Sequence, residues 1–174
     1  MKCAASLRGT VRLARTPDAV RNFCPRETLV DIRPASTVAE VLAAGHLFDA
    51  PPREEWAARF LAADGHVMLI AYVDGAPAGF VSGVEMLHPD KGVEMCLYEL
   101  AVDDPFRRRG IGGALTRALV DLARERGCYD VWVGVEPDNE AALATYRSTG
   151  AGDDGRFAML VWEFGDTTTG GSQP

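Results

Sequence analysis

The sequence predicts one α/β domain in which helices flank a mixed central sheet. Three observations lead to this prediction. The 174 residues fit one ordinary domain, and the 47% of apolar residues are enough for a sizeable core. Stretches of strand character alternate with stretches of helical periodicity, in the order β-α-α-β-β-β-α-β-α-β, and we find no internal repeat.

The amino-terminal part of the domain is expected to contain a strand and two helices. Residues 29–35 have the composition of a strand. Thr37 and Glu40 have the spacing of a capping box, which predicts the start of a first helix. Pro52 suits the first turn of a second helix, and Gly65 suits its end.

Five more strands are expected from the hydrophobic pattern, which alternates or stays apolar over short stretches. Asp74-Gly75 is a hairpin signal between the first two of them. The predicted strands cover residues 66–73, 77–84, 94–102, 129–135 and 156–164.

The clearest element is a helix that begins directly after three arginines and a glycine. From Ile111, apolar residues recur at the spacing of one helical face, and Gly127 is a natural stop. The first N–H groups of a helix have no intrahelical partner, and the helix dipole places about half a positive charge there. Glycine lets a ligand approach the backbone closely. Residues 107–113 therefore predict an anion site, which a phosphate or pyrophosphate fits best.

Two nucleotide-binding motifs fit this stretch poorly. A P-loop needs Lys-Ser/Thr after its last glycine, whereas Gly113 is followed by Ala114 and Leu115. A dinucleotide fingerprint that starts at Gly110 would place Leu115 at its last glycine or alanine position. An arginine run before the first glycine is also wrong for that tight turn.

Instead, Arg107-x-x-Gly110-x-Gly112 resembles the Q/R-x-x-G-x-G/A acetyl-CoA signature of the GNAT superfamily of N-acetyltransferases. Downstream, residues 139–150 resemble the family's N-x-x-A-x-x-x-Y-x-x-x-G helix. The resemblance covers residues 29–164 and implies a single-domain GNAT fold with splayed strands at the acetyl-CoA site. It implies direct transfer of acetyl from acetyl-CoA to an amine in a ternary complex, without a metal.

The resemblance also implies which residues contact the cofactor. In the family, loop amides bind the CoA pyrophosphate, and the pantetheine arm lies along the preceding strand. One departure is Arg108, where many members carry a second glycine. The implied contacts are Leu100, Ala101 and Val102 on the strand, Arg107, Arg108, Arg109, Gly110, Ile111, Gly112 and Gly113 in the loop, and Asn139, which is also expected to cap its helix.

Two side chains are candidates for the chemistry. A carboxylate at Glu99 would accept the proton of the amine, with Glu94 and Glu85 as weaker rivals. The alternative for Glu99 is a partly solvated strand residue. Tyr146 matches the family tyrosine that protonates the departing thiolate, and its alternative is a core tyrosine. The Val102 amide would polarise the thioester carbonyl.

The acceptor is expected to be a small cationic amine. The net charge of −7 favours a cationic partner and argues against nucleic acid. Residues 93–102 and 46–49 resemble gentamicin-type aminoglycoside 3-N-acetyltransferases, which implies an aminoglycoside acceptor and antibiotic resistance; the loop after residue 135 departs by being shorter. A polyamine, another small amine, a protein N-terminus or a non-catalytic acyl-CoA-binding domain are the alternatives. The candidate acceptor residues are Glu85, Asp90, Glu94, Glu136 and Asp138.

The ends of the chain and its cysteines complete the prediction. The basic residues 1–28 are expected to be a disordered extension, residues 29–164 the domain, and residues 165–174 a disordered tail. The four cysteines have no metal-ligand spacing, which favours a reduced, cytoplasmic protein. No apolar run reaches the ~20 residues that a membrane span needs. The sequence leaves a homodimer open.

Overall fold

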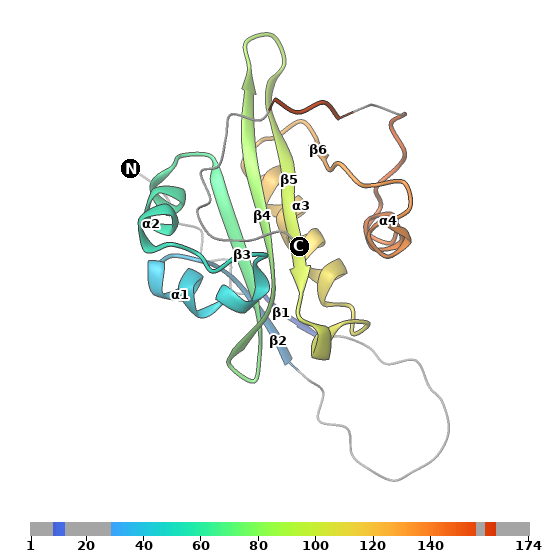
Figure 1. Ribbon diagram of the computed structural model, residues 1–174. Helices are drawn as coiled ribbons and strands as arrows, with labels where there is room; N and C mark the ends of the chain where they lie inside the picture. The colour runs from blue at the N-terminus through green and yellow to red at the C-terminus, as the bar shows by residue number, and fades with distance from the viewer. Residues whose placement is uncertain (1–8, 13–28, 156–158, 163–174) are drawn as a thin grey trace, which may run out of the picture.

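Figure 1 shows the computed structural model, which describes residues 9–12, 29–155 and 159–162. Its sheet has the strand order β1-β2-β3-β4-β5-β6. Strands β1 to β5 are antiparallel to their neighbours, and β6 is parallel to β5. The predicted mixed sheet is therefore confirmed. The strands are β1 (Gly9–Arg12), β2 (Leu29–Pro34), β3 (His66–Val73), β4 (Ala76–His88), β5 (Gly92–Val102) and β6 (Val131–Trp132).

Helices cover both faces of the sheet (Figure 1). One apolar cluster joins α1 and α2 to side chains such as Ile70 and Phe80. A second, larger cluster joins α3 to side chains such as Met95 and Leu97. The helices are α1 (Val38–Ala43), α2 (Glu54–Ala62), α3 (Ile111–Glu125) and α4 (Glu140–Arg147), and short 3₁₀ turns are η1 (Gly45–Leu47) and η2 (Asp104–Phe106).

Local signals in the sequence explain where several elements start and turn. The Glu40 N–H donates to the Thr37 hydroxyl at 3.3 Å, and the Thr37 N–H donates to the Glu40 carboxylate at 3.1 Å, so the predicted capping box is confirmed. Asp74 and Gly75 have φ of 50° and 84°. Two positive φ values are those of a type I′ turn, which is the turn that suits the twist of a hairpin.

A bulge in the β4–β5 hairpin changes which face of the sheet β5 presents. Ser82 pairs with Glu99, but the next pair is Gly83 with Leu97, so Tyr98 is the extra residue. Leu97 packs in the α3 cluster, whereas Ala101 packs against the α1–α2 cluster. Because side chains alternate along a strand, Glu99 shares the α1–α2 face with Ala101. Without the bulge, Glu99 would point at α3.

Three segments differ from the sequence-based expectation. Gly9–Arg12 pairs with β2 although no strand was expected there; pairing along an edge can form a strand without a strong hydrophobic pattern. The strand expected over 129–135 is shorter, because only Val131 and Trp132 pair with β5. Residues 159–162 are not in a strand, and their side chains are 71–76% exposed. The remainder of 1–28, residues 156–158 and 163–164, and the tail 165–174 lie outside the described residues.

Candidate active site

The sheet opens into a fork between β5 and β6. The two strands pair only at Met95 with Val131 and at Cys96 with Trp132. Beyond this point, within the part of the chain that the structure describes, no strand pairs with β5 on its β6 side. The expected splay is therefore confirmed, and the fork offers an open strand edge to a ligand.

The open edge presents backbone donors of β5. The Asp103 N–H donates to the Ala78 carbonyl at 3.0 Å, which fixes the direction in which the end of β5 faces β4. Because N–H directions alternate along a strand, the N–H groups of Leu100 and Val102 face the fork. An extended ligand arm can pair with them as an added strand would. The Val102 amide thus faces the fork, and its role toward the thioester carbonyl stays a prediction.

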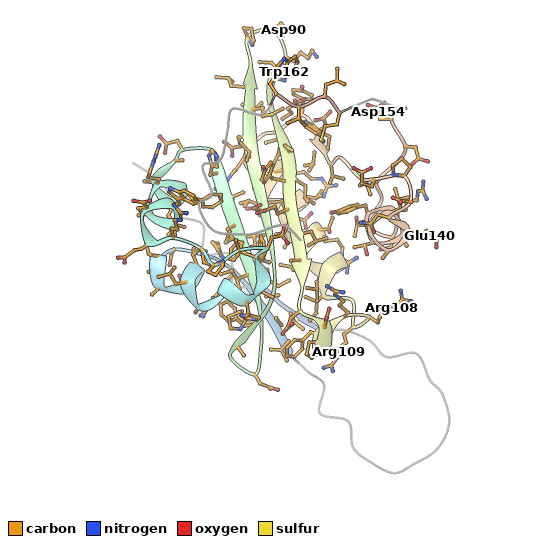
Figure 2. All side chains as sticks on the ribbon, viewed as in Figure 1. Asp90, Arg108, Arg109, Glu140, Asp154 and Trp162 are labelled. Atoms are coloured by element: carbon orange, nitrogen blue, oxygen red, sulfur yellow. The ribbon has the colours of Figure 1, made fainter. Side chains whose placement is uncertain are left out.

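The arginine loop, residues 103–110, joins β5 to α3, and the Arg107 side chain fixes its start. The Arg107 Nε–H donates to the Val102 carbonyl at 3.0 Å, and its Nη1 lies 2.8 Å from the Asp104 carboxylate. Its side chain therefore closes the loop. Arg108 and Arg109 are exposed and project from the loop end of the molecule (Figure 2). The Arg109 guanidinium lies over the Phe106 ring, with its central carbon 5.3 Å from the ring centroid. Arg108 and Arg109 carry the positive charge that was expected for a phosphate.

The start of α3 leaves backbone donors without a hydrogen-bond partner among the described residues. Gly110 is the N-cap, and because glycine has no side chain it makes no capping hydrogen bond. The first helical bond runs from the Ala114 N–H to the Gly110 carbonyl at 3.0 Å. The N–H groups of Ile111, Gly112 and Gly113 precede it and point out of the helix. No acidic side chain stands in this first turn. This donor set fits the pyrophosphate of acetyl-CoA.

Gly112 leaves the backbone at the start of α3 accessible to a ligand. A Cβ placed there would meet only Thr145 Cγ2 at 3.5 Å and more distant side-chain atoms, which is ordinary contact. Packing therefore does not require glycine, and glycine costs a helix about 1 kcal/mol relative to alanine. Open backbone for a ligand is the remaining physical reason for this residue.

Arg108 carries backbone strain that glycine would relieve. Its φ is 61°, in the left-handed region that non-glycine residues avoid. This explains why many family members have glycine at this position. We expect Arg108→Gly to raise the unfolding free energy by up to ~1 kcal/mol, and therefore to raise the melting temperature slightly. The same change should weaken acetyl-CoA binding, because it removes a positive charge. Arg109→Gly, where φ is not positive, should lower the melting temperature instead. Thermal unfolding that ranks the two variants the other way would contradict this prediction.

Glu99 lies beside the open edge on the α1–α2 face, and although the residue as a whole is exposed, its carboxylate is partly shielded from water. Partial burial raises the pKa of Glu99, the negative charge of Asp49 raises it further, and the Ser82 hydroxyl lowers it. Ser82 is only 1% exposed, and its hydroxyl has no well-aligned partner among the described residues. It lies opposite Glu99 in the strand pair, so its effect is that of a nearby dipole rather than of a formed bond. The result is a carboxylate with increased basicity.

Tyr146 lies in α4 and is 9% exposed, packed in the α3 cluster. It lines a cavity of ≈ 270 Å³ whose walls come from α3, β6 and the end of α4. Burial raises the pKa of its hydroxyl, which therefore stays protonated. Asn139 accepts a hydrogen bond from the Ala142 N–H at 3.0 Å, so the predicted cap of α4 is confirmed. Its contact with the cofactor stays a prediction.

The five acidic residues expected to contact the acceptor lie apart. Glu85 pairs at 2.7 Å with Arg126, the C-cap of α3, on the face opposite Glu99. Asp90 is at the hairpin tip, at the far end of the sheet from the arginine loop (Figure 2). Glu94 is bound by neighbouring side chains, and Glu136 and Asp138 are exposed in the loop before α4. Sequence reasoning missed Ser82, because a serine inside an apolar strand carries no signal of its own.

Comparison with known proteins places these features in a family. A model described as the acetyltransferase (GNAT) family matches residues 32–151, which covers the fork, the arginine loop and Tyr146. The chain belongs to this family. Family members use acetyl-CoA as the acetyl donor, and the donor set at the start of α3 fits it. Glu99 and Tyr146 in these roles remain predictions.

Individual relatives cover this GNAT chain only in part. The [ribosomal protein bS18]-alanine N-acetyltransferase of Salmonella typhimurium is 42% identical over 57 residues, 33% of this chain and 38% of the relative. The chain thus matches well under half of that relative's length.

Solved structures of the same fold align over more of the chain. An aminoglycoside acetyltransferase, meta-AAC0020, from an uncultured soil metagenomic sample, in complex with sisomicin, superposes with a TM-score of 0.72 at 19% identity, covering 78% of this chain and 96% of that one. The structure of AAC(6′)-Iy in complex with a bisubstrate analog superposes with a TM-score of 0.67 at 21% sequence identity, covering 77% of this chain and 98% of that one. At these identities the likeness shows the fold.

Two structural features are absent from the described part of the chain. No helix among the described residues is long and apolar enough to cross a bilayer. These residues also contain no group of three or more His, Cys, Asp or Glu side chains that could hold a metal ion.

Proposed function

We propose that this protein transfers the acetyl group of acetyl-CoA directly to a primary amine of a polycationic acceptor. The observation that carries the proposal is Glu99, a carboxylate of raised pKa beside the open edge of β5. A base works best when its pKa approaches the working pH, because it must be deprotonated and still attract a proton. The position and the pKa of Glu99 both suit that task.

Each step is assigned to a group of this chain. Glu99 accepts a proton from the ammonium of the acceptor, which leaves a neutral nitrogen able to attack the thioester carbon. The Val102 N–H donates to the carbonyl oxygen as negative charge develops there. The Tyr146 hydroxyl donates a proton to the sulfur as the carbon–sulfur bond breaks. The attached nitrogen loses its second proton to solvent as the intermediate collapses, and solvent restores the proton of Tyr146 and removes that of Glu99. The products are the amide and the free thiol.

An aminoglycoside is the proposed acceptor. Its several ammonium groups suit a chain of net charge −7 whose proposed base lies within the field of a second carboxylate, Asp49. Aminoglycoside acetyltransferases also occur among the structures of the same fold. The resemblance of residues 93–102 favours the 3-amino group, whereas several neighbouring structures carry a 6′ name, so the product's position of acetylation is a separate measurement.

A protein N-terminus is the second candidate acceptor. It is favoured by the relative named as a ribosomal protein bS18-alanine acetyltransferase, at 42% identity over 57 residues. A peptide brings one α-amino group to the site, whereas an aminoglycoside brings several ammonium groups. The two candidates therefore differ in how strongly binding depends on charge.

The test is a free-thiol release assay with acetyl-CoA across aminoglycosides, polyamines and N-terminal peptides. We expect turnover with at least one aminoglycoside and a peptide turnover far below it. Absence of thiol release with every amine tested would favour a non-catalytic acyl-CoA-binding domain. Two-dimensional NMR of the product would show which amino group carries the acetyl.

The acceptor's apparent affinity should fall as salt rises. Exposed charges are screened over a Debye length of about 8 Å at physiological ionic strength and over shorter distances at higher salt. The measurement is KM for the best acceptor between low and high salt, with acetyl-CoA saturating. A neutral or anionic best substrate, or a KM that ignores salt, would count against a polycationic acceptor.

A further inference from the structure

The closed end of the fork is joined by a cluster of polar side chains around Glu94, which we call the Glu94 clamp: Glu94, Tyr129, Trp132 and His88. The Tyr129 hydroxyl donates to one carboxylate oxygen of Glu94, and the Trp132 indole N–H donates to the other at 3.1 Å. His88 Nε2 lies 3.0 Å from the same second oxygen, without the alignment of a hydrogen bond. One carboxylate thus ties β5 to β6 and to β4.

The clamp stands where the two strands part. Glu94 lies two residues before the last residue of β5 that pairs with β6, and Trp132 is the last paired residue of β6. Among the described residues only two residue pairs join these strands, and two backbone bonds hold the segment just before β6: the Tyr129 N–H donates to the Val93 carbonyl at 2.8 Å, and the Met95 N–H donates to the Asp130 carbonyl at 3.1 Å. The side-chain bonds of the clamp add to this short contact. The strands beyond this point diverge around the open edge with the Leu100 and Val102 donors. Movement of β6 at the clamp would change the width of the whole fork.

Charge keeps the clamp closed at neutral pH. The hydrogen bond from Tyr129, followed by the contact with His88, lowers the pKa of Glu94, and the same bond raises the pKa of Tyr129 to about 12. Tyr129 therefore stays a donor and Glu94 stays an acceptor across the working range. Because the pKa of Glu94 is lowered in the folded state, the clamp's contribution is lost only as the pH falls through that lowered value.

We propose that Glu94 is a positioning residue for acetyl-CoA: by fixing β6 against β5 at the closed end of the fork, it sets the gap that receives the pantetheine arm. The inference rests on the proposed placing of that arm along β5. Glu94 does not contact the acceptor in this account, since both its oxygens are engaged and its side chain is 14% exposed. The arginine loop lies at the opposite end of β5, so the clamp affects the arm and leaves the phosphate site unchanged.

The experiment separates the two halves of the cofactor. Tyr129→Phe removes one donor while keeping the ring, and Glu94→Gln removes the charge. Calorimetry measures the binding of acetyl-CoA and of adenosine 3′,5′-bisphosphate, which has phosphates but no pantetheine arm. We expect each variant to lose about tenfold in affinity for acetyl-CoA, the scale of one charge-assisted hydrogen bond, and less than twofold for the bisphosphate.

Arg126→Gln is the matched control, because it breaks the 2.7 Å ion pair with Glu85 on the other face of the same hairpin. It should change the melting temperature without changing the ratio of the two affinities. If the clamp variants keep their affinity for acetyl-CoA, or lose both ligands equally, the clamp has only a structural role and the inference is wrong. A wild-type protein that binds both ligands equally well would instead overturn the placing of the arm.

Discussion

Replacing Gly112 with glutamate is expected to abolish acetyl-CoA binding while the protein still folds. The new side chain would occupy the space in front of the free N–H groups at the start of α3, and its negative charge would repel the phosphates there. The fold should survive because a Cβ at this position meets nothing closer than 3.5 Å. Calorimetry with acetyl-CoA and a circular dichroism melt measure the two effects separately.

Alanine variants at two glycines serve as matched controls. Gly112→Ala should keep or raise the melting temperature, because alanine favours a helix by about 1 kcal/mol over glycine. It should reduce the affinity for acetyl-CoA moderately. Gly79→Ala should destabilise the fold, since its Cβ would lie 2.7 Å from the Ala101 carbonyl oxygen. The phosphate site assignment would be wrong if Gly112→Glu bound acetyl-CoA within a few-fold of the parent.

The features that the sequence predicts well are those that depend on neighbouring residues. The capping box at Thr37, the turn at Asp74-Gly75 and the periodic face of α3 are each specified within one or two turns of chain. The arginines, glycines and helix start on which the proposed anion site rests also lie within seven residues of one another, and the structure places the helix start as predicted. Local chemistry is enough to predict such features.

The features that escaped prediction depend on residues far apart in the sequence. The bulge at Tyr98, which turns Glu99 toward the α1–α2 face, appears only when β4 and β5 are placed in register. The same register brings Ser82 to Glu99. The Glu94 clamp joins residues 35 and 38 positions apart, and Glu94 read alone looked like one more free carboxylate. Strand β1 is likewise defined by its partner more than by its own pattern.

Replacing Glu99 with glutamine is expected to cut turnover by ~10²–10⁴-fold, the usual effect of removing a general base. Glutamine keeps the size of the side chain but cannot accept the proton that the ammonium must lose. Acetyl-CoA affinity should change little, because Glu99 lies on the face away from α3 and the phosphate site. The melting temperature at neutral pH should not fall, because burial already disfavours the charged form of Glu99.

The pH dependence of kcat/KM tests whether Glu99 acts as the base. Glu99 works deprotonated, so parental kcat/KM should fall as the pH drops through its pKa, and at a higher pH than an ordinary glutamate because that pKa is raised. Ser82→Ala removes the dipole that lowers this pKa and should move the acidic limb to still higher pH. In Glu99→Gln the limb should disappear, and Ser82→Ala added to it should shift nothing further.

Activity at high pH distinguishes loss of the proposed base, Glu99, from loss of the proposed acid, Tyr146. The deficit of Glu99→Gln should shrink as the pH rises, because more of the acceptor amine is already neutral. Tyr146→Phe should slow departure of the thiolate, which alkali does not rescue in that way. Pre-steady-state thiol release and the full pH–rate profile of both variants give the comparison. Near-parental turnover of Glu99→Gln at neutral pH would pass the role of the base to a water chain or to another carboxylate, and it would leave acetyl transfer itself intact.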